Sequence, residues 1–448
     1  MSKKKGKKRN AGPPQPAVRL SQCMIVKNEE KNIEKALGWA RNVAFEQIVV
    51  DTGSTDRTVE LATKMGAKVL HFKWIDDFAA AKNFAIEQAT GNWIAFLDAD
   101  EYFSPEDTKK LMIFLKRIQA DPEMRAKYLV LNCPWVHVDE NGKPFNVQDQ
   151  ERVFRNLPSL RYIGRIHERL SLSLDNVVRV NEISMIHTGY TNTVYEETRK
   201  ADRNIEMLRT ELAEKPNDLN IKGYLADSLA SAALRGGPTG ADSLGEAETL
   251  YKEVMKGGAE VFLALKKKAY LHFIEKYVDD HEQRTECEEL CQKALKDIPG
   301  DIDFEYFYAT SLNHAGEYSA ALDLLLGCEQ KLAAAADLDV SLIVSADPTL
   351  LFGQLLMAAQ GLGDIESVIK YATLILAADK SRQGVVGPYI TTLLQHSSSE
   401  DEVVDVLKTL YDLGDPEDLL ILAKAAKDCG AIAFARRIMA MAGKIMQN

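Results

Sequence analysis

Short apolar runs alternate with helix-like segments from residue 19 to about residue 190, and this alternation constrains the fold more than any other feature. Strands are expected at 21–26, 47–50, 68–72 and 93–97. Helices are expected between them at 28–40, 56–65 and 77–89, the last capped by Asp76 or Asp77. Strands that alternate with helices form a mostly parallel sheet with helices on both faces. The sequence therefore predicts an α/β domain over 19–195.

The pattern changes near Tyr195, after which Ala and Leu dominate and apolar residues recur at helical spacing. Three glycines in helix–turn–helix contexts are each followed, five residues later, by a small or β-branched residue: Gly316 by Ala321, Gly363 by Val368 and Gly430 by Ala435. This resembles tetratricopeptide packing, in which a small residue lets paired helices approach closely. We expect an all-α, tetratricopeptide-like domain over 196–448, with an exposed loop at 236–240; a plain helical bundle is the alternative.

The composition excludes several classes of protein. A net charge of −11 argues against a nucleic-acid-binding body, and no apolar run approaches 18 residues, so we expect no membrane span. Residues 1–18 hold six basic residues without a following apolar run, which predicts a disordered basic tail rather than a secretory signal; an electrostatic tether is the alternative. The scattered cysteines predict free thiols and a cytoplasmic protein. Cys287 and Cys291 have no second pair with which to bind zinc.

Three carboxylates follow the apolar run at 94–97 directly, in the string Ile-Ala-Phe-Leu-Asp-Ala-Asp-Glu. Two aspartates one residue apart at the end of a strand, Asp98 and Asp100, can hold a divalent cation against a phosphate. The turns after the first two expected strands, at 27–29 and at Asp51, fall on the same edge. Because ligands bind beyond the carboxyl ends of parallel strands, we expect the functional site there.

Four segments carry a resemblance by their order and spacing: MIVKNE at 24–29, VVDTGSTD at 49–56, DFAAAKNF at 77–84 and AFLDADE at 95–101. Together they resemble the family 2 glycosyltransferases, which have the GT-A fold, from about Leu20 to Tyr190. The helical half is similar to the tetratricopeptide extension of some bacterial members that modify peptides or flagellin. The resemblance implies inverting transfer from a UDP-sugar, with Mn²⁺ or Mg²⁺ as cofactor.

The nucleotide-sugar site follows from the resemblance together with the chemistry of the side chains. A carboxylate at Asp51 can accept from the uracil imide N–H, and Glu29 can bond the ribose or base. A turn or helix cap is the alternative for Asp51, and a charge facing a helix dipole is the alternative for Glu29. Lys82, on a helix otherwise rich in alanine, can bind the diphosphate; the alternative is a solvated surface lysine. The remaining expected contacts with the nucleotide are Val26, Gly53 and Ala99, although turn chemistry alone also explains Gly53.

The metal site is expected at the two aspartates. In similar enzymes the first, Asp98 here, touches the ribose or a metal-bound water, and the second, Asp100, ligates the metal. Carboxylates and phosphate oxygens suit Mg²⁺ and Mn²⁺. His187 follows an apolar stretch far along the chain. The resemblance makes it the third ligand, and a structural histidine is the alternative.

The catalytic base is expected between residues 148 and 169. Inverting transfer is a single displacement in which a carboxylate takes the acceptor proton. We expect Glu168 in this role, with Asp149 and Glu151 as rivals and His167 as a residue that orients the base or binds the acceptor. The Glu-Asp pair that is common in the family has no clear counterpart in this sequence, and Gln150-Glu151 is its nearest match. The alternative for Glu168 is a salt bridge to Arg165 or Arg169.

The function expected from these features is transfer of a sugar from a UDP-sugar to a protein or peptide side chain, of flagellin or of a secreted peptide. The helical half would dock the acceptor. Two alternatives stay open: a saccharide or cell-wall glycosyltransferase whose helical half makes a homodimer, and a scaffold with a degenerate transferase domain. A nucleotidyltransferase is disfavoured because 27–29 offers no Gly-rich loop for a triphosphate.

Overall fold

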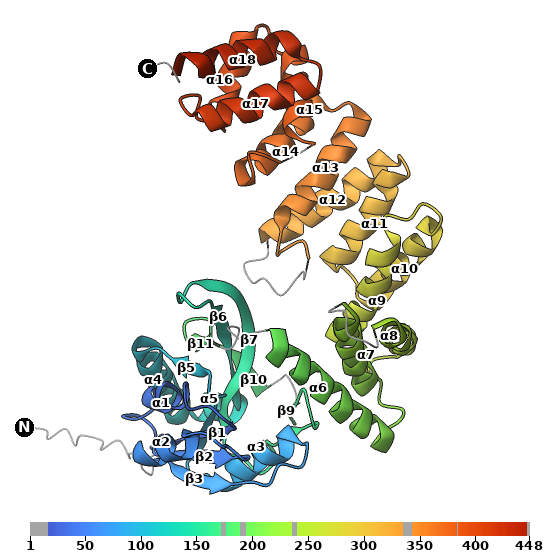
Figure 1. Cartoon of the computed structure of the whole chain (residues 1–448). Helices are drawn as coiled ribbons and strands as arrows, with labels where there is room; N and C mark the ends of the chain where they lie inside the picture. The colour runs from blue at the N-terminus through green and yellow to red at the C-terminus, as the bar shows by residue number, and fades with distance from the viewer. Residues whose placement is uncertain are drawn as a thin grey trace, which may run out of the picture. The chain divides into compact units, whose positions relative to one another are not determined.

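The computed structural model of the chain describes residues 17–171, 176–188, 194–234, 240–334, 343–382 and 384–445 (Figure 1). The chain divides into two compact units, Met1–Glu248 and Thr249–Asn448, which are described separately. The first unit contains every strand that the described residues form, and the second is helical in the part described. This arrangement confirms the expected α/β domain followed by an all-α domain. The boundary expected at 195 and 196 stays a prediction.

The first unit is built on a nine-stranded mixed sheet with the order β3-β2-β1-β4-β7-β6-β11-β5, and β10 pairs with β6. Its strands are β1 (Leu20–Val26), β2 (Glu46–Asp51), β3 (Lys68–His71), β4 (Trp93–Phe96), β5 (Glu101–Phe103), β6 (Val130–Val138), β7 (Pro144–Arg155), β10 (Val177–Arg179) and β11 (Met185–His187). β1 pairs in parallel with β2 and β4, and β2 pairs in parallel with β3. β7 runs antiparallel to β4 and β6, whereas β11 runs parallel to β6 and antiparallel to β5. The carboxyl ends of β1, β2 and β4 therefore meet at one edge.

β1 and β4 are buried on both faces, so their side chains alternate between two cores with a period of two. In β1, Cys23 joins the core under α3 (Phe78–Glu87), and Met24 joins the core under α1 (Ile33–Gly38) and α2 (Thr58–Lys64). The same alternation places Ile94 of β4 with α3 and Ala95 with α4 (Pro105–Ala120). Short helix α5 (Pro122–Lys127) follows α4.

Two local expectations need correction. The helix expected from residue 28 begins at Ile33, because Asn28 has a left-handed backbone (φ 59°) and its side chain bonds the next loop instead. Asp77 caps α3 by accepting from the backbone N–H of Ala80 at 2.8 Å. Asp76 does not cap it: its backbone is also left-handed (φ 54°), and its carboxylate accepts from the Trp74 indole at 2.8 Å.

The first unit also contains a small sheet of β8 (Tyr162–Ile163) and β9 (Arg169–Leu170), and the helices α6 (Val194–Glu214) and α7 (Leu219–Leu234). Helices α6 and α7 pack against each other. The helix α8 (Gly240–Val254) spans the division between the units. The expected loop at 236–240 lies largely outside the described residues, as does the expected basic tail.

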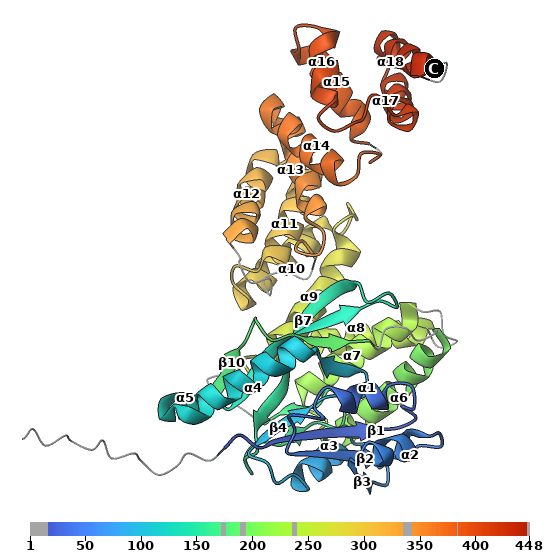
Figure 2. The ribbon, with the colours of Figure 1, turned by 90° about the vertical axis from the view of Figure 1, so that its left-hand side faces the viewer.

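The second unit consists of helical hairpins (Figure 2). Its described helices are α9 (Leu263–Tyr277), α10 (Arg284–Asp297), α11 (Ile302–His314), α12 (Tyr318–Ala334), α13 (Pro348–Leu362), α14 (Ile365–Ala378), α15 (Val386–His396), α16 (Glu400–Leu407), α17 (Pro416–Asp428) and α18 (Ile432–Ile445). Gly316, Gly363 and Gly430 have φ of 81°, 70° and 84° in the turns that join α11 to α12, α13 to α14 and α17 to α18. The residue five positions after each glycine is buried. The repeated pattern in the sequence is thus the turn of a packed helix pair.

Among the helices of the described residues, none is both long and apolar enough to cross a bilayer. All six cysteines are free thiols, and five of them are buried.

Candidate functional site

Asp51 ends β2 and holds a tight turn. Its carboxylate accepts from the backbone N–H groups of Gly53 at 3.2 Å and Ser54 at 3.0 Å, and His71 Nδ1 lies 3.3 Å away. Burial raises the pKa of Asp51, but the hydrogen bonds from Ser54, Gly53 and His71 outweigh it and leave the pKa below its usual value. Gly53 has φ 113°, a conformation that residues with a Cβ rarely adopt. The turn therefore presents an ionised carboxylate at the edge of the sheet.

The loop after β1 is tied to this turn. Asn28 accepts from the Thr55 N–H at 2.7 Å, and its own N–H donates to Ser54 Oγ at 2.9 Å. The Glu29 N–H donates to Thr58 Oγ1 at 2.7 Å. The Glu29 carboxylate accepts from the Asn32 amide at 2.8 Å, and Val26 ends β1 in register with Asp51. No role was predicted for Asn28, although an asparagine in a polar turn is a recognisable signal for a left-handed backbone.

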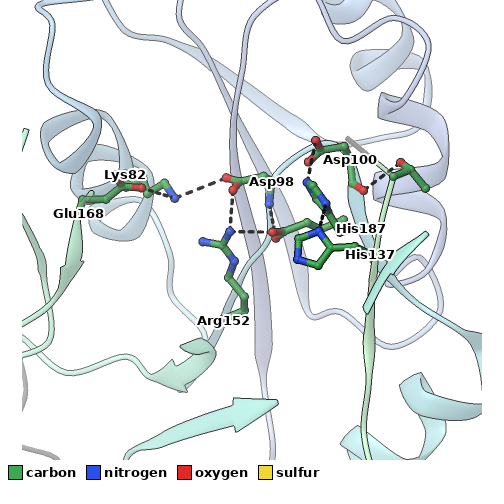
Figure 3. A network of polar contacts seen from close by, with 9 residues as sticks. Lys82, Asp98, Asp100, His137, Arg152, Glu168 and His187 are labelled. Carbon is green, nitrogen blue, oxygen red and sulfur yellow. Dashed lines mark hydrogen bonds and ion pairs between the residues drawn. The ribbon is translucent and has the colours of Figure 1, made fainter. Parts of the chain in front are cut away.

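Lys82 lies in the core of the unit, and its side chain is 2% exposed. Its ammonium is 2.8 Å from Glu168 Oε1 and 3.4 Å from Asp98 Oδ1 (Figure 3). The ammonium also lies 5.1 Å from the ring centroids of Phe96 and Tyr162. Burial lowers the pKa of Lys82, but Asp98 and Glu168 more than reverse that effect, so the pKa is above its usual value. The alternative of a solvated surface lysine is therefore wrong.

Arg152, which the sequence analysis missed, joins the same network from β7. Its Nη2 lies 2.7 Å from Asp98 Oδ2 and 2.7 Å from Glu101 Oε1, and Glu101 is fully buried. Glu101 also accepts from the Asp98 N–H at 2.9 Å. The only signal in the sequence is a basic residue within a strand that enters the core. Arg152 reaches the site because β7 pairs with β4 in the sheet, and the sequence of one strand does not reveal that pairing.

This network fixes the charge of Asp98. Burial raises the pKa of Asp98, but Arg152 and Lys82 lower it to about 2, so the carboxylate is ionised at neutral pH. Burial and the Asp98 charge together raise the pKa of Glu101, against the effect of Arg152. Both Asp98 oxygens are engaged, one by each cation.

Asp100, His187 and His137 form a second cluster next to this network (Figure 3). Asp100 Oδ2 is 3.3 Å from His187 Nε2, and His187 Nδ1 is 3.1 Å from His137 Nδ1. The register of the strands brings these three residues together, because His187 of β11 is paired with Glu101 of β5 and with His137 of β6. The N–H of Thr188 donates to the Asp100 carbonyl at 3.1 Å, which fixes the end of the strand.

These residues fit a divalent cation. Neighbouring ligand atoms of an octahedral ion lie about 3 Å apart, close to the Asp100–His187 separation. His137 is fully buried, and burial and His187 lower its pKa, so it is neutral. A neutral His137 can accept at Nδ1 from the Nδ1–H of His187, which leaves the lone pair of His187 Nε2 facing Asp100. A cation between them would be bound by His187 Nε2 and by the Asp100 carboxylate. Within the described parts of the chain, no group of three or more His, Cys, Asp or Glu side chains is arranged to hold a metal.

The three candidate bases have different surroundings. Glu168 follows His167 in the loop between β8 and β9 and pairs with Lys82, whereas Arg165 pairs with Glu214 of α6. Asp149 accepts from Arg179 Nε at 2.8 Å. Burial raises the pKa of Glu151, and Arg169 opposes this. Glu168 contacts the network around Asp98 through Lys82.

Residues 21–124 match the family model described as glycosyl transferase family 2. This part of the chain is a family 2 glycosyltransferase domain. A TPR repeat-containing protein of Synechococcus elongatus is 34% identical over 229 residues, which cover 49% of this chain and 53% of that protein. The glycosyltransferase SunS encoded by Bacillus subtilis is 30% identical over 199 residues, which cover 42% and 44%. The chain therefore spans about half the length of these curated relatives.

Among solved structures, S. aureus TarS 1-349 in complex with UDP-GlcNAc is 14% identical with a TM-score of 0.35, covering 66% of this chain and 91% of that one. The family 2 match includes every residue expected at the nucleotide and both metal-site aspartates: Val26, Glu29, Asp51, Gly53, Lys82, Asp98, Ala99 and Asp100. His187, Arg152 and all three candidate bases lie beyond residue 124, outside the matched part of the family 2 domain.

Proposed function

We propose that this chain is a metal-dependent, inverting glycosyltransferase that moves a sugar from a UDP-sugar to a peptide or protein side chain. The observation that carries the proposal is a pair of charged clusters, one around Lys82, Asp98 and Arg152 and the other around Asp100 and His187. Lys82, Asp98 and Asp100 lie in the part of the chain that matches family 2. Both clusters lie where ligands bind in α/β sheets.

The donor would be held by groups that are already ordered. The ionised Asp51 carboxylate is suited to accept from the uracil imide, with Val26, Glu29, Gly53 and Ala99 around the nucleoside. The Lys82 ammonium has three donors, two of which face Glu168 and Asp98, so the third is available for a diphosphate oxygen. Arg152 would hold Asp98 in place.

Asp100 and His187 would hold Mn²⁺ or Mg²⁺, with Asp98 in reach of the ribose or of a water in the shell. Bound there, the ion would offset the negative charge of the departing nucleoside diphosphate. The Thr188 N–H and His137 keep the two ligating side chains in this geometry.

Transfer would be one displacement. The bond from the acceptor oxygen to the anomeric carbon forms, the bond from that carbon to the diphosphate oxygen breaks, and the acceptor proton goes to Glu168. The Glu168 side chain is 16% exposed, which leaves it accessible. Asp149 and Glu151 are the rivals for this role.

The proposed acceptor is polypeptide, in flagellin or a secreted peptide. Helical hairpin arrays present concave surfaces to extended peptides, and the second unit is such an array. Free cysteines are in keeping with a reducing compartment such as the cytoplasm.

The test is incubation of the full chain with Mn²⁺, a panel of UDP-sugars and candidate peptide acceptors, followed by intact-mass analysis. A mass gain equal to one sugar on a peptide, lost in Asp100→Ala, supports the proposal. Transfer to saccharides but to no peptide would favour the alternative in which the helical half makes a homodimer. No transfer and no UDP release with any donor would favour a non-catalytic scaffold.

A further inference from the structure

The loop that carries Glu168 is held on one side by α3, the helix that carries Lys82. The Asn83 side chain bonds the backbone of Tyr162 in both directions, at 2.9 Å each. The Phe78 N–H, in the first turn of α3, donates to the Arg165 carbonyl at 2.8 Å. Lys82 follows Phe78 by one helical turn, so these bonds set the distance between Lys82 and the loop.

On its other side the loop is held by α6 and α7. The Arg165 N–H donates to Glu211 Oε2 at 3.1 Å, and its guanidinium donates to Glu214 Oε1 at 2.6 Å. A surface pocket of about 390 Å³ opens beside this contact, lined by Tyr162, Ile163 and Gly164 together with Glu211, Glu214 and Lys215. The loop is therefore held on this side by specific polar interactions.

A further contact on this side is a ring stack next to Glu168. His167 has a left-handed backbone (φ 53°), and its imidazole lies parallel to the Tyr224 ring of α7, with centroids 4.3 Å apart and 10° between the planes. This conformation is uncommon for a residue with a Cβ and needs support from its surroundings. The turn places Ile166 inside and lets Glu168 reach Lys82 at 2.8 Å.

We propose that Tyr224 is a positioning residue of the transferase site. Its ring holds the His167 imidazole, and through it the left-handed turn from which Glu168 meets Lys82. Helices α6 and α7 therefore serve the site itself, in keeping with their place in the first compact unit. The inference rests on the proposed function only for the role of Glu168 as the base.

The test compares Tyr224→Ala and Tyr224→Leu, which remove the aromatic ring, with Tyr224→Phe, which keeps it, all in the full chain. Tyr308→Ala on α11 is a matched control, because Tyr308 is also half-buried on a helix. The first readout is amide hydrogen exchange of residues 162–170. The second is kcat, compared with the affinity for UDP in the same variant.

We expect Tyr224→Ala and Tyr224→Leu to raise exchange in 162–170 at least tenfold and to lower kcat about 10- to 100-fold, with UDP affinity within twofold of wild type. Tyr224→Phe and Tyr308→Ala should leave both unchanged. Added to Glu168→Gln, Tyr224→Ala should slow turnover no further, because both act through one group. Normal exchange and kcat in Tyr224→Leu would overturn the inference. If the wild type transfers no sugar, the proposed function fails, and exchange alone decides whether Tyr224 holds the loop.

Discussion

Arg152 pairs with two carboxylates at once, so its replacement by methionine should destabilise the first unit. The variant leaves Glu101, which is fully buried, and Asp98, whose side chain is 39% exposed, without their shared cation. Breaking a buried ion pair from one side costs about 3–5 kcal/mol. Water and Lys82 compensate Asp98 in part, so we expect about 3 kcal/mol. For a unit of this size that lowers Tm by about 6–12 °C.

The loss should also depend on pH. In the wild type the pKa of Glu101 is higher in the folded state than in the unfolded chain. The free energy of unfolding therefore falls as the pH rises above the pKa that Glu101 has in the unfolded chain. Without Arg152 this pKa rises further, because the largest favourable charge is gone. Glu101 then binds a proton in the folded variant over a wider range. The difference in Tm between Arg152→Met and wild type should be larger at pH 8 than at pH 5.

Differential scanning calorimetry at the two pH values measures both effects. Glu101→Gln is the companion change, since Arg152→Met with Glu101→Gln removes the unpaired charge and should recover most of the lost Tm. The reasoning is refuted if Arg152→Met melts like wild type at pH 8, or if the added Glu101→Gln restores nothing.

Three further changes address the site. Glu168→Gln should lower kcat about 100- to 10,000-fold with UDP-sugar affinity retained, measured by UDP release and calorimetric titration; a comparable loss in Asp149→Asn or Glu151→Gln alone would move the base there. His137→Phe should weaken Mn²⁺ binding about 10- to 100-fold by releasing His187, as measured by electron paramagnetic resonance, and unchanged affinity would remove His137 from the metal site. Gly53→Ala forces a Cβ into φ 113° and should destabilise the turn by about 1–3 kcal/mol, weakening UDP binding; wild-type Tm and affinity would contradict the role of the turn.

Local patterns in the sequence predict a large part of the fold. Apolar runs located β1 to β4 to within a residue or two. Of these strands, β1 and β4 are buried on both faces, which favours runs of apolar residues. The Asp77 cap and the glycine turns of the helical hairpins depend on neighbouring residues only, and for that reason they were also predictable. The predicted start of α1 was wrong because the Asn28 side chain accepts a hydrogen bond from Thr55, 27 residues along the chain.

The candidate site was predictable where it depends on one loop and not where it depends on pairing across the sheet. Asp51, Asp98 and Asp100 are marked by their place at the ends of strands. Arg152 and His137 face the site only because β7 pairs with β4 and β6 pairs with β11. Tyr224 reaches the Glu168 loop through the packing of α7, which a helical pattern alone does not locate.

The proposed function depends on metal-dependent transfer from a UDP-sugar at the Asp100–His187 edge. The most direct measurement is UDP release by the full chain with an active donor, in Mn²⁺ and in chelator, for wild type, Asp100→Asn and His187→Gln. We expect release by the wild type that chelator abolishes and Mn²⁺ restores, and at least a hundredfold loss in both variants with folding retained. Metal-independent release, or wild-type rates in Asp100→Asn, would contradict it.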